Sequence, residues 1–193
     1  MKKIIVLSLL VISVVCGKSV EEIQSEWLQK AGDKTQKQKE IFWQSEEANR
    51  LYPHCQGGNG DKGACKRIID LHDKSCKNGL AWSCIILAND YLQGNEQMGI
   101  KVNTKKAVAY ANKVCKLDAT FCASMSGLFM YKNRKLALKY AEKACKMGEM
   151  ADCVIATEWW AVGFGGIGRN PQKVKYYSDK LCKAGLKEAC NTQ

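Results

Sequence analysis

Apolar residues recur along most of this chain at offsets of three, four and seven, the spacing that places side chains on one face of an α-helix. The pattern is clearest ahead of four cysteines, which are Cys76, Cys115, Cys145 and Cys182. Five positions before them stand Leu71, Tyr110, Tyr140 and Tyr177, and eight positions before them stand Ile68, Ala107, Ala137 and Val174. The spacing predicts four amphipathic helices, each ending near a cysteine.

A second apolar pattern begins at the cysteine that follows each of these four. In three copies an aromatic residue stands seven positions after that second cysteine, at Tyr91, Phe129 and Trp160. Each pair of cysteines therefore lies between two helices, and each unit is predicted to be a helical hairpin. A glycine that suits a left-handed C-cap follows the first helix in three copies, at Gly79, Gly148 and Gly185.

The cysteine pairs themselves repeat. Their first members are 39, 30 and 37 residues apart, a period typical of helical repeats that bury their apolar faces by stacking. The first cysteine ends one helix and the second begins its antiparallel neighbour, so the two Cα atoms can approach within the roughly 4.4–6.8 Å that a disulfide needs. We predict the local pairs Cys55–Cys65, Cys76–Cys84, Cys115–Cys122, Cys145–Cys153 and Cys182–Cys190.

The repeat pattern weakens before Cys55. Residues 19–31 and 36–53 are each predicted to form a helix, and a glycine-rich loop follows over residues 57–63. The last hairpin is expected to be a stub, because the chain ends three residues after Cys190. We therefore divide the sequence into a signal peptide (1–17), N-terminal helices with the glycine-rich loop (18–63) and an all-α repeat domain (64–193).

The first residues are typical of a bacterial signal peptide, because Lys2 and Lys3 precede a short apolar run. The run is shorter than the about 20 residues that cross a bilayer, and no other stretch approaches that length, so no transmembrane span is expected. Cleavage after Gly17 is the favoured interpretation and predicts a secreted or periplasmic protein. In the alternative, Cys16 becomes a lipidated first residue that anchors the protein to a membrane.

The number of cysteines supports export, and the net positive charge favours an anionic partner. Ten of the 11 cysteines remain after residue 17, an even number that indicates a disulfide framework in an oxidising compartment. No close C-x2-C pair is present and only His54 and His72 could add nitrogen ligands, so neither a metal nor another cofactor is expected. The net charge of +11 falls to +9 without Lys2 and Lys3, which favours an anionic envelope or host ligand over nucleic acid.

Two stretches share a fuller motif. Gly94, Gly99-Ile100, Asn103, Lys106-Ala107, Tyr110 and Lys113-Val114-Cys115 recur as Gly163, Gly166-Ile167, Asn170, Lys173-Val174, Tyr177 and Lys180-Leu181-Cys182. These elements resemble a Sel-one-like repeat. With the C-x7-C pairs added, roughly residues 64–193 are similar to the Helicobacter cysteine-rich protein family.

The resemblance implies a right-handed α-solenoid of disulfide-linked hairpins that is exported. It also implies penicillin binding and weak β-lactamase activity, with a β-lactam or peptidoglycan fragment as ligand. The sequence contains none of the S-x-x-K, S-D-N and K-T-G motifs of serine lactamases, and Ser178-Asp179-Lys180 is the nearest approach. No catalytic residue is therefore assigned, and hydrolysis stays an alternative, so whether the protein is an enzyme is left open.

The segment from Gly163 to Gly168 matches G-x-G-x-x-G, the fingerprint of dinucleotide-binding proteins. That function requires a preceding strand, whereas a helix is predicted here, so we interpret the glycines as a loop between helices. Of the adjacent Trp159 and Trp160, one is expected in the core and the other as an exposed contact.

Lysines form the most regular surface feature. They stand two positions before and one position after each first cysteine, at Lys74, Lys77, Lys113, Lys116, Lys143, Lys146, Lys180 and Lys183. Stacking would align these eight residues, the lysine stripe, into a binding surface for anionic ligands. The interpretation that these lysines only stabilise their helices is stronger than the binding interpretation, because lysine at a helix C-terminus interacts favourably with the helix macrodipole.

The favoured function is an exported repeat scaffold, expected to be a monomer, that binds a protein, a peptide or a cell-envelope ligand. Helical repeats offer extended surfaces rather than deep pockets, and such surfaces suit the recognition of macromolecules.

Overall fold

We describe a computed structural model of the chain over residues 36–56 and 61–191. In this part of the chain the regular structure is helical, apart from a single β-bridge between Asn95 and Ile100. The eight α-helices of the described residues are α3 (Gln36–Gln56), α4 (Lys62–Lys77), α5 (Ala81–Gln93), α6 (Thr104–Leu117), α7 (Ala119–Phe129), α8 (Arg134–Lys146), α9 (Met150–Val162) and α10 (Pro171–Lys183). The same residues include two short 3-10 helices, η1 (Phe164–Gly166) and η2 (Lys187–Asn191). The all-α class predicted from the spacing of apolar residues is confirmed.

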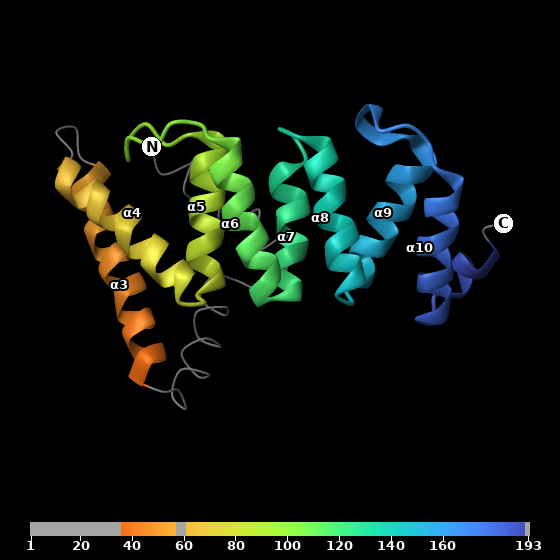
Figure 1. The fold of residues 1–193 in the computed structure, drawn as a ribbon, viewed down its shortest axis with the longest axis horizontal. Helices are drawn as coiled ribbons and strands as arrows, with labels where there is room; N and C mark the ends of the chain where they lie inside the picture. Colours follow the sequence, from red (N-terminus) through yellow and green to blue (C-terminus); the bar gives the residue numbers. More distant parts are fainter. Residues whose placement is uncertain (1–35, 57–60, 192–193) are drawn as a thin grey trace. The chain divides into compact units, whose positions relative to one another are not determined.

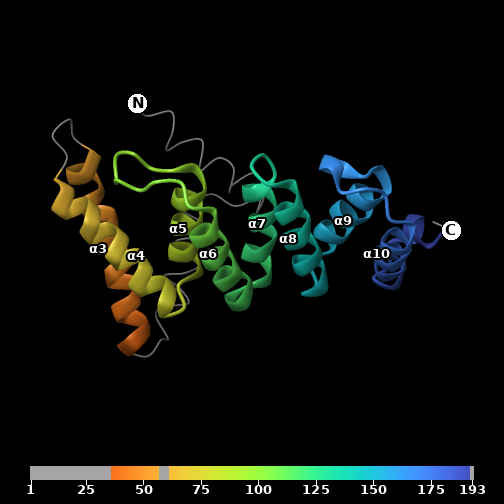
Figure 2. The same ribbon diagram turned by 45° about the horizontal axis from the view of Figure 1, so that its top comes forward.

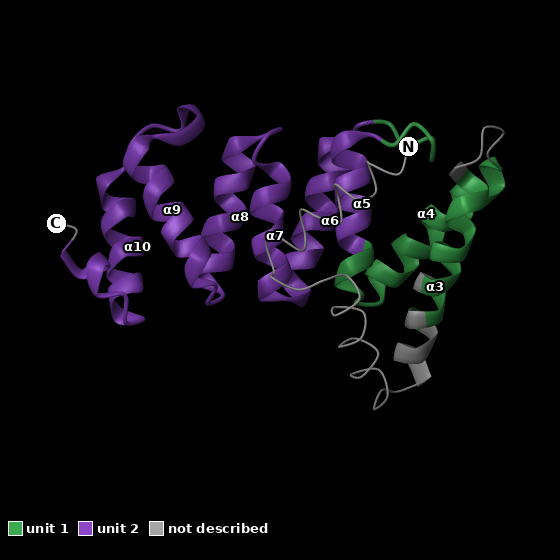
Figure 3. Cartoon of the chain, turned by 180° about the vertical axis from the view of Figure 1, so that it is seen from behind, with its two compact units in different colours: residues 1–83, 95–101 green, residues 84–94, 102–193 purple. Residues whose placement is uncertain are grey.

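The chain divides into two compact units, coloured separately in Figure 3. Unit 1 contains residues up to 83 and residues 95–101, and unit 2 contains residues 84–94 and 102–193. In unit 1, α3 packs against α4 through buried residues that include Ala48, Ile68 and Leu71. The apolar periodicity before Cys76 thus places one face of α4 in a core.

In unit 2, each helix from α6 to α10 packs against the next one along the chain, with α6 to α9 side by side in Figure 1 and Figure 2. Residues of the repeated apolar positions fill this core, since Tyr140, Tyr177 and Phe129 are fully buried. Phe129 stacks on Tyr140 with a 5.2 Å centroid separation. Two aromatic residues that follow a second cysteine, Tyr91 and Phe129, thus stack on a tyrosine of the next hairpin.

Short turns at the disulfides connect the first helix of a hairpin to the second. Cys55 pairs with Cys65, Cys115 with Cys122, Cys145 with Cys153 and Cys182 with Cys190, over Cα separations of 4.4 to 4.9 Å. Cys76 and Cys84 are disulfide-bonded as well. Gly79, Gly148 and Gly185 each adopt a positive φ, the region that favours glycine.

Helix starts follow capping side chains. Asp61 accepts a hydrogen bond from the Gly63 amide, so α4 begins at Lys62 and includes the last residues of the expected glycine-rich loop. The expected helix over residues 19–31 and the alternative lipidation site Cys16 lie outside the described residues. None of the described helices combines the length and apolar character that a membrane crossing requires.

Candidate basic interface

Charged residues are segregated by helix in unit 2. Helices α6, α8 and α10 carry four, five and four lysine or arginine residues, and only Glu142 and Asp179 are acidic. Helices α5, α7 and α9 carry no lysine or arginine. The first helix of each hairpin is thus strongly basic, and the second is not.

The basic helices also contact one another. The Tyr140 hydroxyl of α8 lies 3.4 Å from the Val108 carbonyl oxygen and 3.4 Å from Asn112 Oδ1, both of α6. The Lys180 ammonium of α10 donates to the Cys145 carbonyl at the end of α8. Helices α6, α8 and α10 therefore join into one basic surface, which we call the basic face.

The lysine stripe predicted from the sequence runs along the C-terminal turns of these helices. In unit 2 the lysines two positions before the cysteine are half-buried, and those one position after it are exposed. Lys113 lies over the Tyr110 ring at 5.3 Å. Burial lowers the pKa of Lys143, and the nearby positive charges of Lys116 and Lys139 lower it further. Lysines of successive helices are thus close enough to repel each other.

In unit 1 the two stripe residues are both exposed, and Lys77 forms an ion pair with Asp73 one helical turn away. Lys74 lines a groove described below. The macrodipole accounts for cations at helix C-termini, and the bond from Lys180 to the Cys145 carbonyl is a direct example across two helices. The half-buried lysines therefore contribute to packing, while Lys116, Lys146 and Lys183 project into solvent.

Charged and aromatic side chains from α8, α9 and α10 form one cluster. Glu142 of α8 accepts hydrogen bonds from the Trp160 indole at 2.9 Å and from the Lys173 ammonium at 3.2 Å. Lys173 also lies within 6 Å of the Trp160 and Tyr177 ring centroids, as cation–π contacts require. Burial raises the pKa of Tyr177, and the Glu142 carboxylate raises it further.

Related groups of side chains lie at the two preceding junctions, where one hairpin packs against the next. Tyr91 stacks on Tyr110 at 5.8 Å, and Lys106 lies 4.7 Å from the Tyr91 centroid. At the middle junction Leu136 replaces the lysine, beside the stacked Phe129 and Tyr140. Lys106 and Lys173 stand in the repeated motif of the sequence but were not assigned to a site, and Glu142 was not singled out. Their signal was present, since each lysine stands nine positions before the first cysteine of its repeat.

The two ends of the basic helices differ. We call the end with the pairs Cys115–Cys122, Cys145–Cys153 and Cys182–Cys190 the stapled edge. At the opposite end, α6, α8 and α10 begin after Asn103, Asn133 and Asn170, and we call this end the asparagine edge. In Figure 1 the stapled edge is at the bottom of unit 2 and the asparagine edge at the top.

The asparagine edge is held by repeated hydrogen bonds. Each asparagine side chain accepts from an amide in the first turn of its helix. The backbone amide of each asparagine donates to a backbone carbonyl near the end of the preceding helix. These bonds run from Asn103 to Tyr91, from Asn133 to Phe129 and from Asn170 to Trp160. The residues after the second cysteine thus fix the position of the next helix start.

The segment from Gly163 to Gly168 lies at this edge between α9 and α10, which agrees with its interpretation as a loop between helices. A Cβ atom at Gly165 would lie 2.7 Å from Arg134 Cβ, and Gly165 has a φ of +67°. The Arg134 guanidinium lies 5.2 Å from the Phe164 ring centroid. Gly165 therefore allows close contact between the loop and α8.

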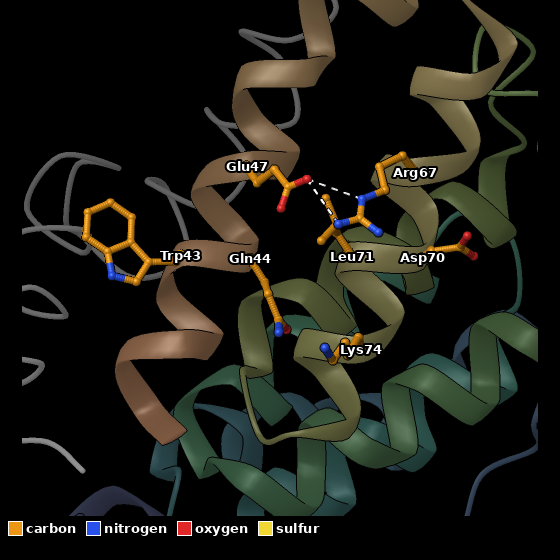
Figure 4. A pocket seen from close by; sticks show the side chains of 7 residues that line it. All are labelled: Trp43, Gln44, Glu47, Arg67, Asp70, Leu71 and Lys74. Atoms are coloured by element: carbon orange, nitrogen blue, oxygen red, sulfur yellow. Dashed lines mark hydrogen bonds and ion pairs between the residues drawn. The ribbon is translucent and has the colours of Figure 1, made fainter. Parts of the chain in front are cut away.

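Unit 1 contains a groove of about 390 Å³ between α3 and α4 (Figure 4). Arg67 donates to Glu47 at 3.2 Å across the groove, and Leu71 forms part of its wall. Gln44 is 8% exposed, and its Oε1 atom has no hydrogen-bond partner among the described residues. The lining contains two cationic and two acidic side chains, so its charges balance and do not select a ligand of one sign.

Other residues named from the sequence are structural. His72 is buried with Nδ1 3.2 Å from the Ser83 hydroxyl, and burial lowers its pKa to about 4. Ser178 is 1% exposed, so its hydroxyl is inaccessible to a ligand. Trp159 is buried, as expected for one of the two tryptophans, whereas Trp160 is half-buried against Glu142 and is not the exposed contact expected of the other.

Two solved structures have similar folds. A Sel1 repeat protein from Oxalobacter formigenes is 16% identical, with 64% of this chain and 95% of that chain covered and a TM-score of 0.39. A protective antigen of uropathogenic Escherichia coli with an SLR fold is 24% identical, with 74% of this chain and 31% of that chain covered and a TM-score of 0.43. No family model and no curated protein matches the sequence.

Proposed function

We propose that the protein is an exported scaffold that binds an acidic protein or peptide on its basic face. The observation that carries this proposal is the segregation of charge, since all lysine and arginine residues of the described α-helices in unit 2 lie on α6, α8 and α10. A surface with one sign of charge attracts a partner of the opposite sign and orients it during approach.

The junction clusters would add specificity to this attraction. Lys106 with Tyr91 and Lys173 with Trp160 each place a cation beside a half-buried aromatic ring. Aromatic and cationic side chains are enriched among residues that dominate binding energy. The all-helical Sel1-like architecture is suited to such a scaffold, because repeats present extended surfaces.

Export is supported by the cysteines. Ten described cysteines are disulfide-bonded, a state that persists in oxidising compartments. Cleavage after Gly17 and a monomeric state remain part of the proposal, and a lipid anchor at Cys16 remains the alternative to cleavage.

The test is fluorescence anisotropy of an oligoglutamate peptide titrated with the oxidised protein. We expect binding that is weakened about tenfold by the double substitution K116E/K146E on the basic face. The matched control, K62E/K66E, reverses two exposed lysines on α4 and should change the affinity by less than about twofold. Equal weakening by both double variants would contradict the proposal, because net charge rather than the basic face would then govern binding.

A further inference from the structure

The asparagine edge exposes apolar side chains at the tips of its turns. Tyr131 is 92% exposed between α7 and α8, Val102 is 61% exposed before α6, and Val162 is 62% exposed at the end of α9. All three are in unit 2, and their turns lie along the same edge in Figure 1 and Figure 2. Large exposed apolar side chains that are rimmed by polar residues are typical of interaction surfaces.

Cations outnumber acidic residues around these tips, although the exposed Glu158 lies one helical turn before Val162. Within unit 2, the described turns of this edge and the first turns of α6, α8 and α10 contain no aspartate or glutamate. The exposed cations there include Lys105, Lys132, Lys135 and Arg169, none of which has an ion pair with a described residue.

Helix stability does not explain these cations. A positive charge near a helix N-terminus opposes the macrodipole, whereas the stripe lysines at the other end of the same helices are favoured by it. The asparagine caps are neutral, while Asp118 caps α7 at the stapled edge. The arrangement therefore maintains positive potential on a surface where it costs stability.

We propose that the asparagine edge docks on an anionic lipid bilayer. Its turns lie along one edge of unit 2 (Figure 1), an arrangement that suits contact with a flat partner. Tyrosine suits the boundary between lipid and water because its ring is apolar and its hydroxyl is polar. Lysine and arginine near the surface are attracted to anionic headgroups, and the exposed valines add apolar contact.

This surface is separate from the stapled edge, where the oligoglutamate test places its substitutions. The stapled edge also exposes apolar residues, at Leu117, Met147 and Leu186. However, Asp118, Glu149 and Glu188 lie in or beside its turns, so its charge is mixed. The two edges therefore provide matched sets of substitutions for one experiment.

The experiment is co-sedimentation of the oxidised full chain with phosphatidylcholine vesicles, with and without phosphatidylglycerol. We expect binding only to the vesicles that contain phosphatidylglycerol. The triple variant K132E/K135E/R169E should weaken this binding by at least about tenfold, and K116E/K146E/K183E by less than about threefold. Both variants change the net charge equally, so the difference reports which edge contacts lipid.

The apolar contribution is tested in parallel. V102S/Y131S/V162S should weaken vesicle binding by at least about fivefold, while L117S/M147S/L186S should leave it unchanged. N133D keeps the cap but adds a carboxylate to the edge, and should weaken vesicle binding with an unaltered circular dichroism spectrum. Absence of vesicle binding, or equal weakening by the two charge-reversed triples, would overturn the docking proposal and leave oligoglutamate binding to be judged separately.

Discussion

The stapled edge and the asparagine edge close the same helices by different means. At the stapled edge, disulfides join the helix ends across loops of only a few residues, and Cα separations reach 4.8 Å at most within unit 2. At the asparagine edge, side-chain caps and backbone hydrogen bonds hold turns that include the 163–170 loop. Covalent disulfide bonds close the stapled edge, and hydrogen bonds hold the asparagine edge.

This difference between the two edges separates the features that stabilise the helices from the features that shape the exposed surface. Stapled turns are constrained independently of their exposed residues, and cations there are compatible with the helix C-termini that end beside them. Turns at the asparagine edge carry exposed cations that oppose the macrodipole, together with exposed apolar tips. Conformational stability is thus concentrated at one end of the helices, and unexplained surface charge at the other.

The largest expected effect tests the covalent edge. The double substitution C145S/C153S should lower the free energy of unfolding by about 2–4 kcal/mol, because the unfolded chain regains freedom that the bridge removes. Urea denaturation of the oxidised protein measures this change. A loss below about 0.5 kcal/mol would show that the staple at α8 and α9 adds little to the hydrogen bonds.

A buried carboxyl group at the stapled edge should produce the next effect. Burial, with a smaller contribution from the Glu149 charge, raises the pKa of Asp152 from 3.8 to about 6, and within the described part of the chain its Oδ1 has no hydrogen-bond partner. The native state therefore holds this proton to higher pH than the unfolded state, so stability falls as pH rises from 3.8 to about 6.

Asp152→Asn removes that charge and should raise the free energy of unfolding by about 1–2 kcal/mol at pH 7. Below the ordinary pKa of the carboxyl the gain should disappear, because both side chains are then neutral. Urea denaturation across this pH range checks the sign. A gain that is independent of pH would mean that packing rather than ionisation distinguishes the two residues.

At the asparagine edge, Asn133→Ala should cost about 1 kcal/mol of unfolding free energy, since the Leu136 amide loses its capping acceptor. Asn133→Asp should restore most of this loss while adding negative charge. Thermal unfolding of the two variants makes the comparison. If alanine and aspartate were equally destabilising, the cap would not be what holds this turn.

The smallest effect is expected at the junction between the edges. Glu142→Gln keeps an acceptor for the Trp160 indole but removes the ion pair with the partly exposed Lys173. We expect a loss of about 0.5 kcal/mol or less, because solvent screens such pairs. Chemical denaturation at low and high salt measures it, and a larger loss that salt does not reduce would indicate a role in packing.

Much of the fold could be predicted from local pattern. The offsets before and after each cysteine placed the helices of the hairpins, and the positions of Tyr140, Tyr177 and Phe129 identified buried residues. The start of α4 was missed because the cap at Asp61 lies within a glycine-rich segment that looked like a loop. The lysine stripe was visible for the same reason as the helices, since its spacing is regular.

The sequence by itself determined the helices, the hairpin order and the basic character of every first helix, because these depend on residues close together along the chain. Only the tertiary structure decided that Glu142, Trp160 and Lys173 meet, since they come from three helices. It also decided that the turns containing Tyr131 and Val102 lie along the same edge as the end of α9, where Val162 stands. Such groupings depend on how consecutive hairpins pack, and local periodicity carries no information about that packing.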